Sequence, residues 1–367
     1  MEMPDQLRVE RADIRLVVVP FRRPLATKVG FFAHWPLVLI DLHTDQGLTG
    51  RSYLAPYVTR SARALLPALR DLGEALAGQA ASPALLGRTA ARWFATAGYQ
   101  GLALAAVAGL DMALWDALAQ QAGLPLARLL GGTLDPVLAY NSNGLGLLPI
   151  DRLATEAHEL LAEGGFTGLK VRVGHDSAAL DLAAVRVVRE AVGSDVALFA
   201  DFNQGLPAGE AGRRCRSLDD EGLAWIEEPL RYDDLAGHAA LARDTATAIS
   251  LGENFWGSRA MLAAIQAGAC DVVMPDLMRI GGVTGWLQAA AIAEATGLPM
   301  SSHLYPEMSA HLLSVTPTAH WLEWQDWANP ILAAPFPVRD GHVQLPDVAG
   351  SGIAWDEDAV RRYAVPG

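Results

Sequence analysis

Residues 197–229 read ALFADFNQGLPAGEAGRRCRSLDDEGLAWIEEP, in which two short apolar strands flank a longer, more polar segment. This is the pattern of one strand–helix–strand unit. Short apolar strands recur along the chain, and segments with helical periodicity, such as 177–192 and 282–296, separate them. The predicted strands span 137–144, 168–173, 197–203, 224–229, 250–255, 272–277, 299–304 and 320–325. Such a series of units predicts an α/β barrel of the TIM type.

A doubly wound parallel sheet is the alternative fold for alternating strands and helices. That fold binds dinucleotides through a Gly-x-Gly-x-x-Gly fingerprint after its first strand. Here the first strand of the series runs into NSNGLG at 141–146, which matches the fingerprint poorly. The barrel is therefore the favoured prediction.

The part of the chain before residue 135 has a different pattern. Residues 37–54, LVLIDLHTDQGLTGRSYL, show apolar alternation on both sides of a turn at 45–47, which predicts a hairpin. Helical periodicity follows from about residue 59 to residue 122. The tail contains no further strand–helix unit, and we expect it to pack against the N-terminal block. The predicted domains are 1–134, 135–330 with the active site, and 331–367.

The composition limits the class of protein. The 367 residues are 51% hydrophobic and 19% charged, which is enough apolar material for a large core. A net charge of −13 argues against nucleic acid as a partner. Cys215 and Cys270 give no disulfide framework, and the N-terminus shows no apolar signal segment, so we expect a cytoplasmic protein. The apolar stretch 101–123 is interrupted by Asp111 and Asp116, which indicates a buried helix and no membrane span.

Three carboxylates fall at the ends of successive predicted strands. Asp201, Glu227 and Glu253 are separated by equal steps of 26 residues (227 − 201 = 253 − 227). Each repeat thus carries one carboxylate to the same height on the next strand, at the barrel mouth where active sites of this fold lie. Any one of them alone could be a helix cap or a surface ion-pair partner, but three in register favour a metal site. Ligands that are all oxygen favour Mg²⁺.

The next strand ends carry a candidate acid–base pair. Asp276 follows the sixth predicted strand and His303 ends the seventh. A carboxylate beside an imidazole orients the ring and raises its basicity, as a general base requires. A lone histidine is more often a satisfied core residue, but its place at a strand end favours catalysis here. Glu323 ends the eighth strand and is a candidate hydrogen-bond donor if its anionic neighbours keep it protonated.

The strand GLKVRVG at 168–174 places Lys170 and Arg172 on one face, because side chains alternate along a strand. In an eight-stranded barrel this strand lies across the mouth from Asp276 and His303. A small-molecule carboxylate held at the metal would then have a candidate base on each side of its α-carbon. This arrangement suits removal of the proton α to a carboxylate through an enediolate that the metal stabilises.

The chain contains, in this order, PLVLIDL, GLKVRVG, DFNQ, WIEEP, GEN, MPDLMRIGGVTGW, PMSSHL, SAHLL and TPTAHWLE. These motifs resemble the enolase superfamily and, within it, the mandelate racemase-like subgroup. The resemblance runs from about residue 24 to the end. It implies a (β/α)7β barrel of the TIM type with an α+β capping domain built from the N-terminal part and the C-terminal tail. It also implies Mg²⁺ as cofactor and a homo-oligomer, expected to be an octamer.

The resemblance further implies roles for single residues. They are Asp201, Glu227 and Glu253 as Mg²⁺ ligands, His303 with Asp276 as one base, Glu323 as the acid facing the substrate carboxylate, and Lys170, Asn203 and Ser142 as substrate contacts. Residues 24–35, PLATKVGFFAHW, match the loop that closes over the substrate, where Phe32 joins Tyr57 in enclosing it. Lys28 in this loop either binds a second carboxylate or a sugar hydroxyl, or is a solvated charge; both interpretations stay open.

Arg172 departs from the family pattern, which has a second lysine there as the base on the other face. A guanidinium group stays protonated at neutral pH and is a poor proton acceptor. The other explanation is a general preference for arginine, since only Lys28 and Lys170 among the 28 basic residues are lysines. We expect one-base chemistry, the dehydration of a sugar acid. The alternative is a racemase or epimerase of a 2-hydroxy acid such as mandelate, with Arg172 in place of the second lysine.

Two other functional classes fit the sequence less well. A barrel metal hydrolase needs His-x-His on the first strand, where residues 141–143 read Asn-Ser-Asn. A non-catalytic relative that binds a hydroxy acid, having lost turnover with its second base, would exchange no α-proton with solvent. Zinc retained in preference to magnesium would support the hydrolase, and exchange of the substrate α-proton in D₂O would distinguish the non-catalytic relative from an enzyme.

Overall fold

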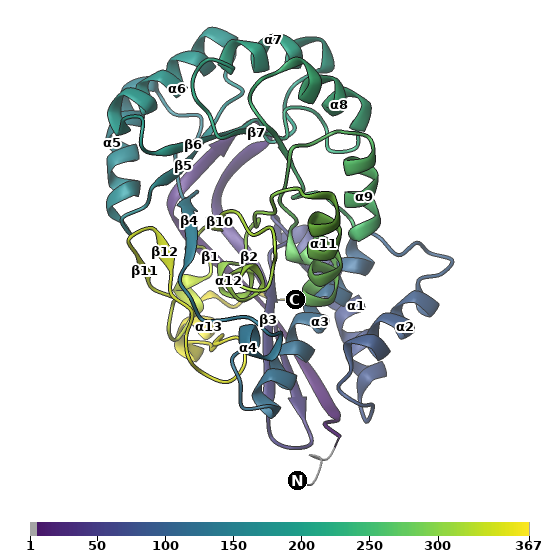
Figure 1. Ribbon diagram of the computed structural model, residues 1–367. Helices are drawn as coiled ribbons and strands as arrows, with labels where there is room; N and C mark the ends of the chain where they lie inside the picture. The colour runs from purple at the N-terminus through teal and green to yellow at the C-terminus, as the bar shows by residue number, and fades with distance from the viewer. Residues whose placement is uncertain (1–5, 367) are drawn as a thin grey trace.

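The second half of the chain closes into a parallel barrel (Figure 1). The computed structural model describes residues 6–366; residues 1–5, where the first predicted domain begins, and residue 367, where the last one ends, lie outside the described residues. The regular barrel strands are β4 (Val137–Asn141), β5 (Gly168–Arg172), β6 (Ala197–Asp201), β7 (Trp225–Glu227), β8 (Ile249–Leu251), β9 (Val272–Val273) and β10 (Leu322–Trp324). They pair in parallel from β4 through β9 in chain order, and β10 pairs with β4.

The predicted strand at 299–304 is not a regular strand. Met300 makes isolated parallel bridges to Val273 of β9 and to Ala319, just before β10. Pro299 at the start of this segment has no N–H to donate to a ladder, which limits the pairing. The bridges of Met300 still join the two ends of the sheet, so the barrel closes. The predicted TIM-type (β/α)7β architecture is confirmed.

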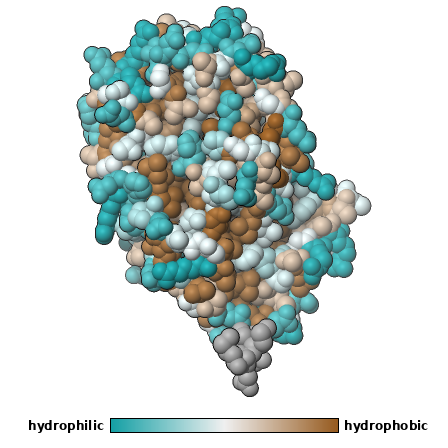
Figure 2. Space-filling model, in the orientation of Figure 1, coloured by the Kyte–Doolittle hydropathy of each residue, from teal (hydrophilic) through white to brown (hydrophobic). Residues whose placement is uncertain are grey.

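The helices between the strands cover the outside of the barrel. They are α5 (Ile150–Ala162), α6 (Ala178–Val192), α7 (Ala208–Leu218), α8 (Leu235–Asp244), α9 (Ser258–Gln266), α10 (Leu277–Ile280), α11 (Gly282–Thr296) and α12 (Pro306–Leu313). Each amphipathic helix turns its apolar stripe inward; α5, for example, buries Leu153, Ala157 and Leu160. Figure 2 accordingly shows hydrophilic residues along the upper rim of the molecule, where Figure 1 places α6 to α8.

Aromatic rings fill the barrel one layer below the strand ends. Tyr140, Phe199, Trp225 and Trp321 form this layer, and the ring centroids of Phe199 and Trp225 lie 4.0 Å apart. Phe199 and Trp225 precede the carboxylates Asp201 and Glu227 by two residues, the repeat that returns a side chain to the same face of a strand. The rings therefore form a floor, and the polar side chains two residues further on lie above it.

The N-terminal block is an antiparallel sheet with helices packed against it. Its elements are β1 (Val9–Thr27), β2 (Gly30–Thr44), β3 (Thr49–Leu54), α1 (Thr59–Leu76), α2 (Pro83–Trp93), α3 (Leu102–Gln121) and α4 (Leu126–Leu129). The predicted hairpin at 37–54 is the β2–β3 pair and is confirmed. The structure adds β1, which the sequence analysis did not predict. Charged residues on the exposed side of β1, such as Glu10 and Arg11, hide the alternation of a half-buried strand.

Strands β1 and β2 continue together beyond this sheet as a two-stranded arm. The pairing is interrupted between Pro20 and Leu25 and resumes with Leu25 opposite Phe32, up to the turn between Thr27 and Gly30. Ion pairs connect the arm to the barrel: Arg22 pairs with Glu163 and Asp326, and Arg23 pairs with Glu159 and Glu163. The tip of the arm is thereby placed over the barrel mouth.

Helix α3 is long and apolar enough to cross a membrane by length and composition, but 78% of that window is buried inside the protein. It packs under β3, and even Asp111 and Asp116 are buried along it. Asp116 accepts hydrogen bonds from the backbone N–H of Arg51 and the side chain of Gln120. The prediction of a buried core helix at 101–123 is confirmed.

The tail contacts both parts of the molecule. Strand β12 (His342–Val343), which pairs with β11 (Val338–Arg339), also pairs antiparallel with β4 of the barrel. Helix α13 (Glu357–Tyr363) then leads to Ala364, which bridges Val17 of β1, and the indole of Trp355 donates a 2.9 Å hydrogen bond to Asp41. The end of the tail thus lies against the N-terminal sheet. The limits of the three domains stay a prediction.

The contact between α3 and β3 allows a stability test. A Cβ atom added at Gly50 would lie 2.0 Å from the backbone oxygen of Ala113, which cannot move without displacing the helix. We expect Gly50→Ala to destabilise the fold by about 1–3 kcal/mol or more, measured by urea unfolding. Gly87→Ala on α2 is the matched control, because a Cβ there meets nothing within 4 Å and should stabilise the helix by up to about 1 kcal/mol. Equal effects of both changes would contradict the assigned packing.

Candidate active site

Three carboxylates converge at the carboxyl ends of the strands. Asp201 and Glu227 end β6 and β7 and are direct neighbours in the sheet register, and Glu253 follows β8. One oxygen from each of the three lies within 4.8 Å of the others, and all three side chains are buried. The structure therefore brings together the set that the 26-residue spacing predicts.

Lys170 is the cation closest to this cluster. Its Nζ lies 2.6 Å from Glu323 Oε1, 2.9 Å from Glu227 Oε1 and 3.4 Å from Asp201 Oδ2. Burial by itself lowers the pKa of this lysine, but Glu227 and Glu323 outweigh that effect and hold the pKa well above its usual value. The ammonium group is therefore a fixed charge at the centre of the site.

The donor set fits Mg²⁺, whose ligands are oxygens. Neighbouring side chains hold each carboxylate in place: Asn203 Nδ2 donates to Asp201 at 2.9 Å, Trp225 Nε1 to Glu227 at 3.1 Å and Asn254 Nδ2 to Glu253 at 3.0 Å. Burial and the charge of Asp201 raise the pKa of Glu227 to about 8, so the lysine alone does not compensate the negative charge. A divalent cation would supply that compensation.

His303 and Asp276 form the predicted pair. Asp276 Oδ2 lies 2.8 Å from His303 Nδ1, so Nε2 is the nitrogen that faces the cavity, 3.3 Å from Glu253 Oε2. Burial lowers the pKa of His303, but Glu253 and Glu323 outweigh this effect and raise it to about 9. A cation held by Glu253 would oppose this increase and favour the neutral imidazole, which accepts a proton.

The role of Glu323 as a hydrogen-bond donor stays a prediction, because it depends on which charges surround its carboxyl group. Burial raises its pKa, but Lys170 and His303 outweigh burial and lower it to about 2. In this arrangement the carboxyl group accepts hydrogen bonds from Ser142 Oγ at 2.8 Å and from the backbone N–H of Leu304 at 3.0 Å. The sequence analysis considered the neighbouring anions and did not place Lys170 directly on Glu323.

Ser142, a predicted substrate contact, does not line the cavity. Its hydroxyl oxygen accepts hydrogen bonds from Arg172 at 3.0 Å and from Gln325 at 3.4 Å, while its proton goes to Glu323. Ser142 thus acts on the cavity through its neighbours. Arg172 itself reaches the cavity, and its Nε lies 3.8 Å from Asp201 Oδ2.

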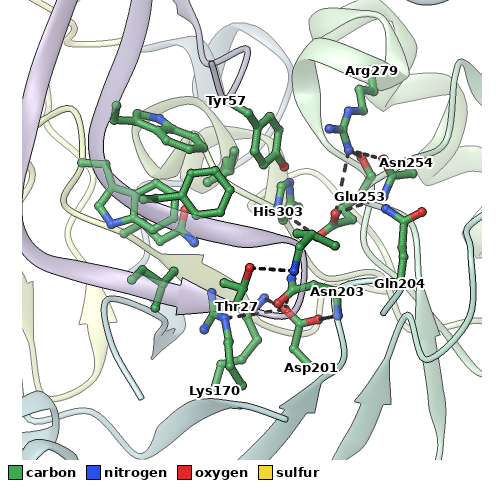
Figure 3. Close-up of a pocket in the computed structure, with 18 residues that line it drawn as sticks. Thr27, Tyr57, Lys170, Asp201, Asn203, Gln204, Glu253, Asn254, Arg279 and His303 are labelled. Carbon is green, nitrogen blue, oxygen red and sulfur yellow. Dashed lines mark hydrogen bonds and ion pairs between the residues drawn. The ribbon is translucent and has the colours of Figure 1, made fainter. Parts of the chain in front are cut away.

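These groups surround a cavity of about 230 Å³ between the barrel mouth and the tip of the β1–β2 arm (Figure 3). Apolar and aromatic side chains form the roof: Leu25, Val29, Phe32, Trp35, Tyr57 and Trp327. The predicted enclosing residues Phe32 and Tyr57 are among them. The polar wall consists of Lys170, Arg172, Asp201, Asn203, Gln204, Glu253, Asn254, Arg279, His303 and Gln325. One side of the cavity is thus apolar and the other is rich in charges and hydrogen-bonding groups.

Lys28 is placed outside the cavity. It is exposed, and its side-chain stem lies against Gly174 and Gly205, where an added Cβ would be 3.3 Å and 2.0 Å from stem atoms. The structure thus packs the stem onto the loops after β5 and β6. This location favours a role for Lys28 in holding the arm against the barrel and is less suited to direct binding of the substrate.

The sequence analysis missed Arg279, which lines the cavity from α10. Its NH1 donates to the backbone oxygen of Glu253 at 2.7 Å and to Asn254 Oδ1 at 2.5 Å, and its guanidinium lies 4.9 Å from the ring centre of Tyr57. Figure 3 shows Arg279 and Asn254 gathered around Glu253. The sequence feature that could have indicated Arg279 is its position three residues after Asp276. This spacing places it about one helical turn from the His303–Asp276 pair. Gln325 was also missed, although it follows Glu323 by the two-residue strand period.

The backbone at the barrel mouth adopts an uncommon conformation. Asn203 and Gln204 after β6 have φ of 46° and 63°, Glu228 after β7 has 35°, and Leu304 and Tyr305 after His303 both have 53°. Residues with a side chain rarely occupy this left-handed region, and when they do they cluster at functional sites. These sharp turns direct the side chains at the strand ends toward the cavity.

Two family models match the chain. The model described as enolase C-terminal domain-like matches residues 152–359, and the mandelate racemase/muconate lactonizing enzyme N-terminal domain matches residues 11–131. The chain belongs to the enolase superfamily. The family expected from the strand motifs is confirmed.

Curated relatives and solved structures agree with this assignment. The chain is 36% identical to L-talarate/galactarate dehydratase of Salmonella typhimurium over 73% of this chain and 67% of that protein. It is similar to a magnesium-bound enolase from alpha pretobacterium bal199, with a TM-score of 0.96 and 50% identity over 98% and 100% of the chains. An enolase from Bradyrhizobium, complexed with magnesium and mandelic acid, has a TM-score of 0.95 and 44% identity over 99% and 100%.

Enolase-superfamily relatives of this chain include dehydratases, cycloisomerases and an epimerase. The chain is therefore an enzyme of a superfamily that contains lyases and racemases. Magnesium in the solved relatives and the acidic triad of this chain agree on the cofactor. The expected Mg²⁺ is confirmed.

The triad predicts that Mg²⁺ stabilises the fold. At a concentration of 100 times its Kd, an ion that binds only the folded state adds about 2.7 kcal/mol. We expect Mg²⁺ to raise the melting temperature and EDTA to lower it, with this shift lost in Asp201→Asn. Exposed Glu294 on α11 provides the control, since Glu294→Gln should keep the full shift. A full Mg²⁺ shift in Asp201→Asn would remove Asp201 from the ligand set.

Proposed function

We propose that this enolase-superfamily enzyme removes the α-proton of a sugar acid and eliminates water, as a dehydratase. His303 carries this proposal, because its Nε2 faces the cavity beside the acidic triad while Asp276 holds its Nδ1. The opposite wall offers Arg172, a poor proton acceptor. One base is sufficient for an elimination, whereas a racemase exchanges protons on both faces of the α-carbon.

In the proposed step, His303 alone performs both proton transfers. Nε2 takes the α-proton, the electron pair of that C–H bond forms a C=C bond to the β-carbon, and the β-hydroxyl group departs. The imidazolium then gives the same proton to the departing hydroxyl, which leaves as water. The enol product becomes a 2-keto acid by taking a proton from solvent at its β-carbon and releasing its enol O–H proton to solvent. Asp276 keeps the ring oriented throughout.

Three carboxylates, Asp201, Glu227 and Glu253, would hold Mg²⁺, which lowers the energy of the negative charge that develops on the substrate carboxylate. Lys170, whose Nζ lies 3.4 Å from Asp201 Oδ2, would place its positive charge beside the same substrate carboxylate. Asn203 lines the cavity beside Asp201 and offers a further polar contact to the substrate.

Polar groups along the cavity support a hydroxylated substrate. Within residues 6–366, the buried side-chain atoms without a hydrogen-bond partner include Tyr57 Oη, Arg172 Nε and NH1, Asn203 Oδ1, Arg279 Nε and Gln325 Oε1. All five residues line this one cavity. Buried polar groups are rarely left unpaired, because the loss of hydration is costly. A substrate with several hydroxyl groups would satisfy them.

A racemase or epimerase of a 2-hydroxy acid is the second candidate, and the aromatic roof favours it. Trp35 packs against Tyr57 and Trp327, with ring centroids 5.0 and 4.7 Å apart, and Phe32 lies beside them. Such a wall fits an aryl substituent. The Bradyrhizobium relative complexed with mandelic acid supports this candidate.

We further propose that the protein is cytoplasmic and forms a homo-oligomer, an octamer as the family resemblance implies. Two buried cysteines without a disulfide, Cys215 and Cys270, support a reducing compartment. Figure 2 shows hydrophobic residues gathered across the middle of the visible face, and apolar patches of this kind are common at subunit contacts. Light scattering on the purified protein would give the number of subunits.

Replacement of the base tests the function. We expect His303→Asn to lower the dehydration of the best acid in an aldonic and aldaric acid library by about 10²–10⁴-fold, with Mg²⁺ binding retained. Exchange of the α-proton in D₂O should fall in parallel. The exposed His158 on α5 gives the control His158→Asn, which should behave as the native enzyme. If no acid is dehydrated while mandelate loses optical activity, the second candidate replaces the first.

Arg172→Lys tests which reaction the residue opposite His303 permits. A lysine is a better proton acceptor than an arginine, so a second base on this wall should allow protons to be exchanged on both faces. We expect the variant to gain racemisation of 2-hydroxy acids, measured by polarimetry. We expect it to lose dehydration, measured by the formation of 2-keto acid. A native enzyme that racemises faster than the variant would mean that Arg172 already acts as a base.

A further inference from the structure

A chain of hydrogen bonds fixes the orientation of two cavity residues, Arg172 and Gln325. The hydroxyl of Ser142 has one proton, which it donates to Glu323 Oε1 at 2.8 Å. Lys170 holds the same carboxylate oxygen from the other side at 2.6 Å. The Ser142 oxygen is therefore left as an acceptor, for Arg172 NH2 at 3.0 Å and Gln325 Nε2 at 3.4 Å. This requires the amide nitrogen of Gln325 to face Ser142.

The opposite ends of both side chains remain without hydrogen-bond partners among the described residues. They are Arg172 Nε and NH1, which are donors, and Gln325 Oε1, which is an acceptor. Arg172 Nε approaches Asp201 Oδ2 only to 3.8 Å, beyond hydrogen-bond distance. Each of the two residues is only 3% exposed, and both line the cavity. The unpaired atoms at these two ends are therefore available to form hydrogen bonds with a ligand in the cavity.

The location of this pair relative to the acidic triad defines what it can reach. Ser142 follows β4, Arg172 ends β5 and Gln325 follows β10, and these three strands are adjacent in the order β10-β4-β5. The triad begins on the neighbouring strand, where Asp201 of β6 is the register partner of Arg172, and it continues over β7 and β8. A substrate with its carboxylate at the triad would therefore extend its remaining carbons toward Arg172 and Gln325.

The chemistry of the pair discriminates between substituents. A hydroxyl group accepts from a guanidinium and donates to an amide carbonyl, so it satisfies both residues. A second carboxylate only accepts, and it would place its negative charge against the carbonyl oxygen of Gln325. An aryl group would leave every one of these atoms unpaired in a buried site, which is costly.

We propose that Arg172 and Gln325, oriented by Ser142, form a subsite for a further hydroxyl group of the substrate, so that the enzyme selects polyhydroxy acids. This inference rests on the proposed function and narrows its substrate class. It assigns Arg172 a binding role, where the family pattern has a base. Gln325 becomes a specificity-determining residue, and Ser142 a positioning residue that acts through both.

A series of four-carbon acids tests the subsite by binding alone. The protein is the Mg²⁺-loaded His303→Asn variant, which binds without turnover, and calorimetry gives the affinities. The ligands are 2-hydroxybutyrate, threonate and erythronate in both enantiomeric forms, and malate. We expect the best trihydroxy acid to bind at least about tenfold more tightly than 2-hydroxybutyrate, and also more tightly than malate. Malate as the tightest ligand, or no preference at all, would overturn the proposal.

Side-chain variants test whether Arg172 and Gln325 cause the preference for trihydroxy acids. Gln325→Met in the same background removes the acceptor at similar volume, and the affinity ratio of trihydroxy acid to 2-hydroxybutyrate should fall toward one. Gln288→Met, at an exposed position on α11, is the matched control and should keep the ratio. Arg172→Met is the second variant, should Gln325→Met fail to fold. An unchanged ratio in a folded variant of either residue would refute the subsite.

The results separate this inference from the proposed function. If the native enzyme exchanges the α-proton of some acid in D₂O but the affinity ratio is near one, only the hydroxyl subsite is wrong. If no acid exchanges its α-proton while the ratio is high and depends on Gln325, the catalytic proposal is wrong and the subsite stands. Retained Mg²⁺ binding and melting temperature in each variant show that the fold is intact.

Discussion

The buried ammonium group of Lys170 among acidic side chains is the interaction on which the site depends. Carboxylates that share a small buried volume repel one another, and taking them out of water adds to the cost. Lys170 contacts Asp201, Glu227 and Glu323, so one cation links the metal site to the opposite wall. Its Nζ lies 5.8 Å from the centre of the Tyr140 ring, which belongs to the aromatic floor. The charges can be gathered here because the barrel brings the strand ends together and the rings exclude water from below.

The two parts of the chain divide the work at this site. The barrel supplies the charges, since its parallel strands all end at one rim and each repeat adds a polar residue there. The N-terminal block supplies the apolar roof, because the β1–β2 arm extends past its own sheet and carries Leu25, Phe32 and Trp35 to the cavity. A change in the arm can therefore alter the fit of the substrate without touching the reacting groups. A change at a strand end affects the chemistry directly.

Regular spacing made much of the fold and site predictable from the sequence. The equal steps between Asp201, Glu227 and Glu253 follow from one repeat per strand, so their convergence needed no coordinates. The charges that act on Glu323 could not be derived in this way, because they include the direct contact with Lys170 from another strand. Ser142 was placed on the correct strand, but only the hydrogen bonds show that it faces Glu323 and not the cavity. Strand β1 was also missed, because the charged residues on its exposed side hide the alternation of a half-buried strand.

The scarcity of lysine has a practical consequence for following the motion of the arm. Lys170 is 1% exposed and held by carboxylates, whereas Lys28 is exposed at the tip of the arm. Apart from the α-amino group, an amine-reactive dye would therefore find a single accessible target in the native protein. Lys28 lies over the loops after β5 and β6, so a dye attached there would report the distance between arm and barrel. The chain thus contains a natural site for a fluorescent reporter of cavity closure, with no engineered cysteine.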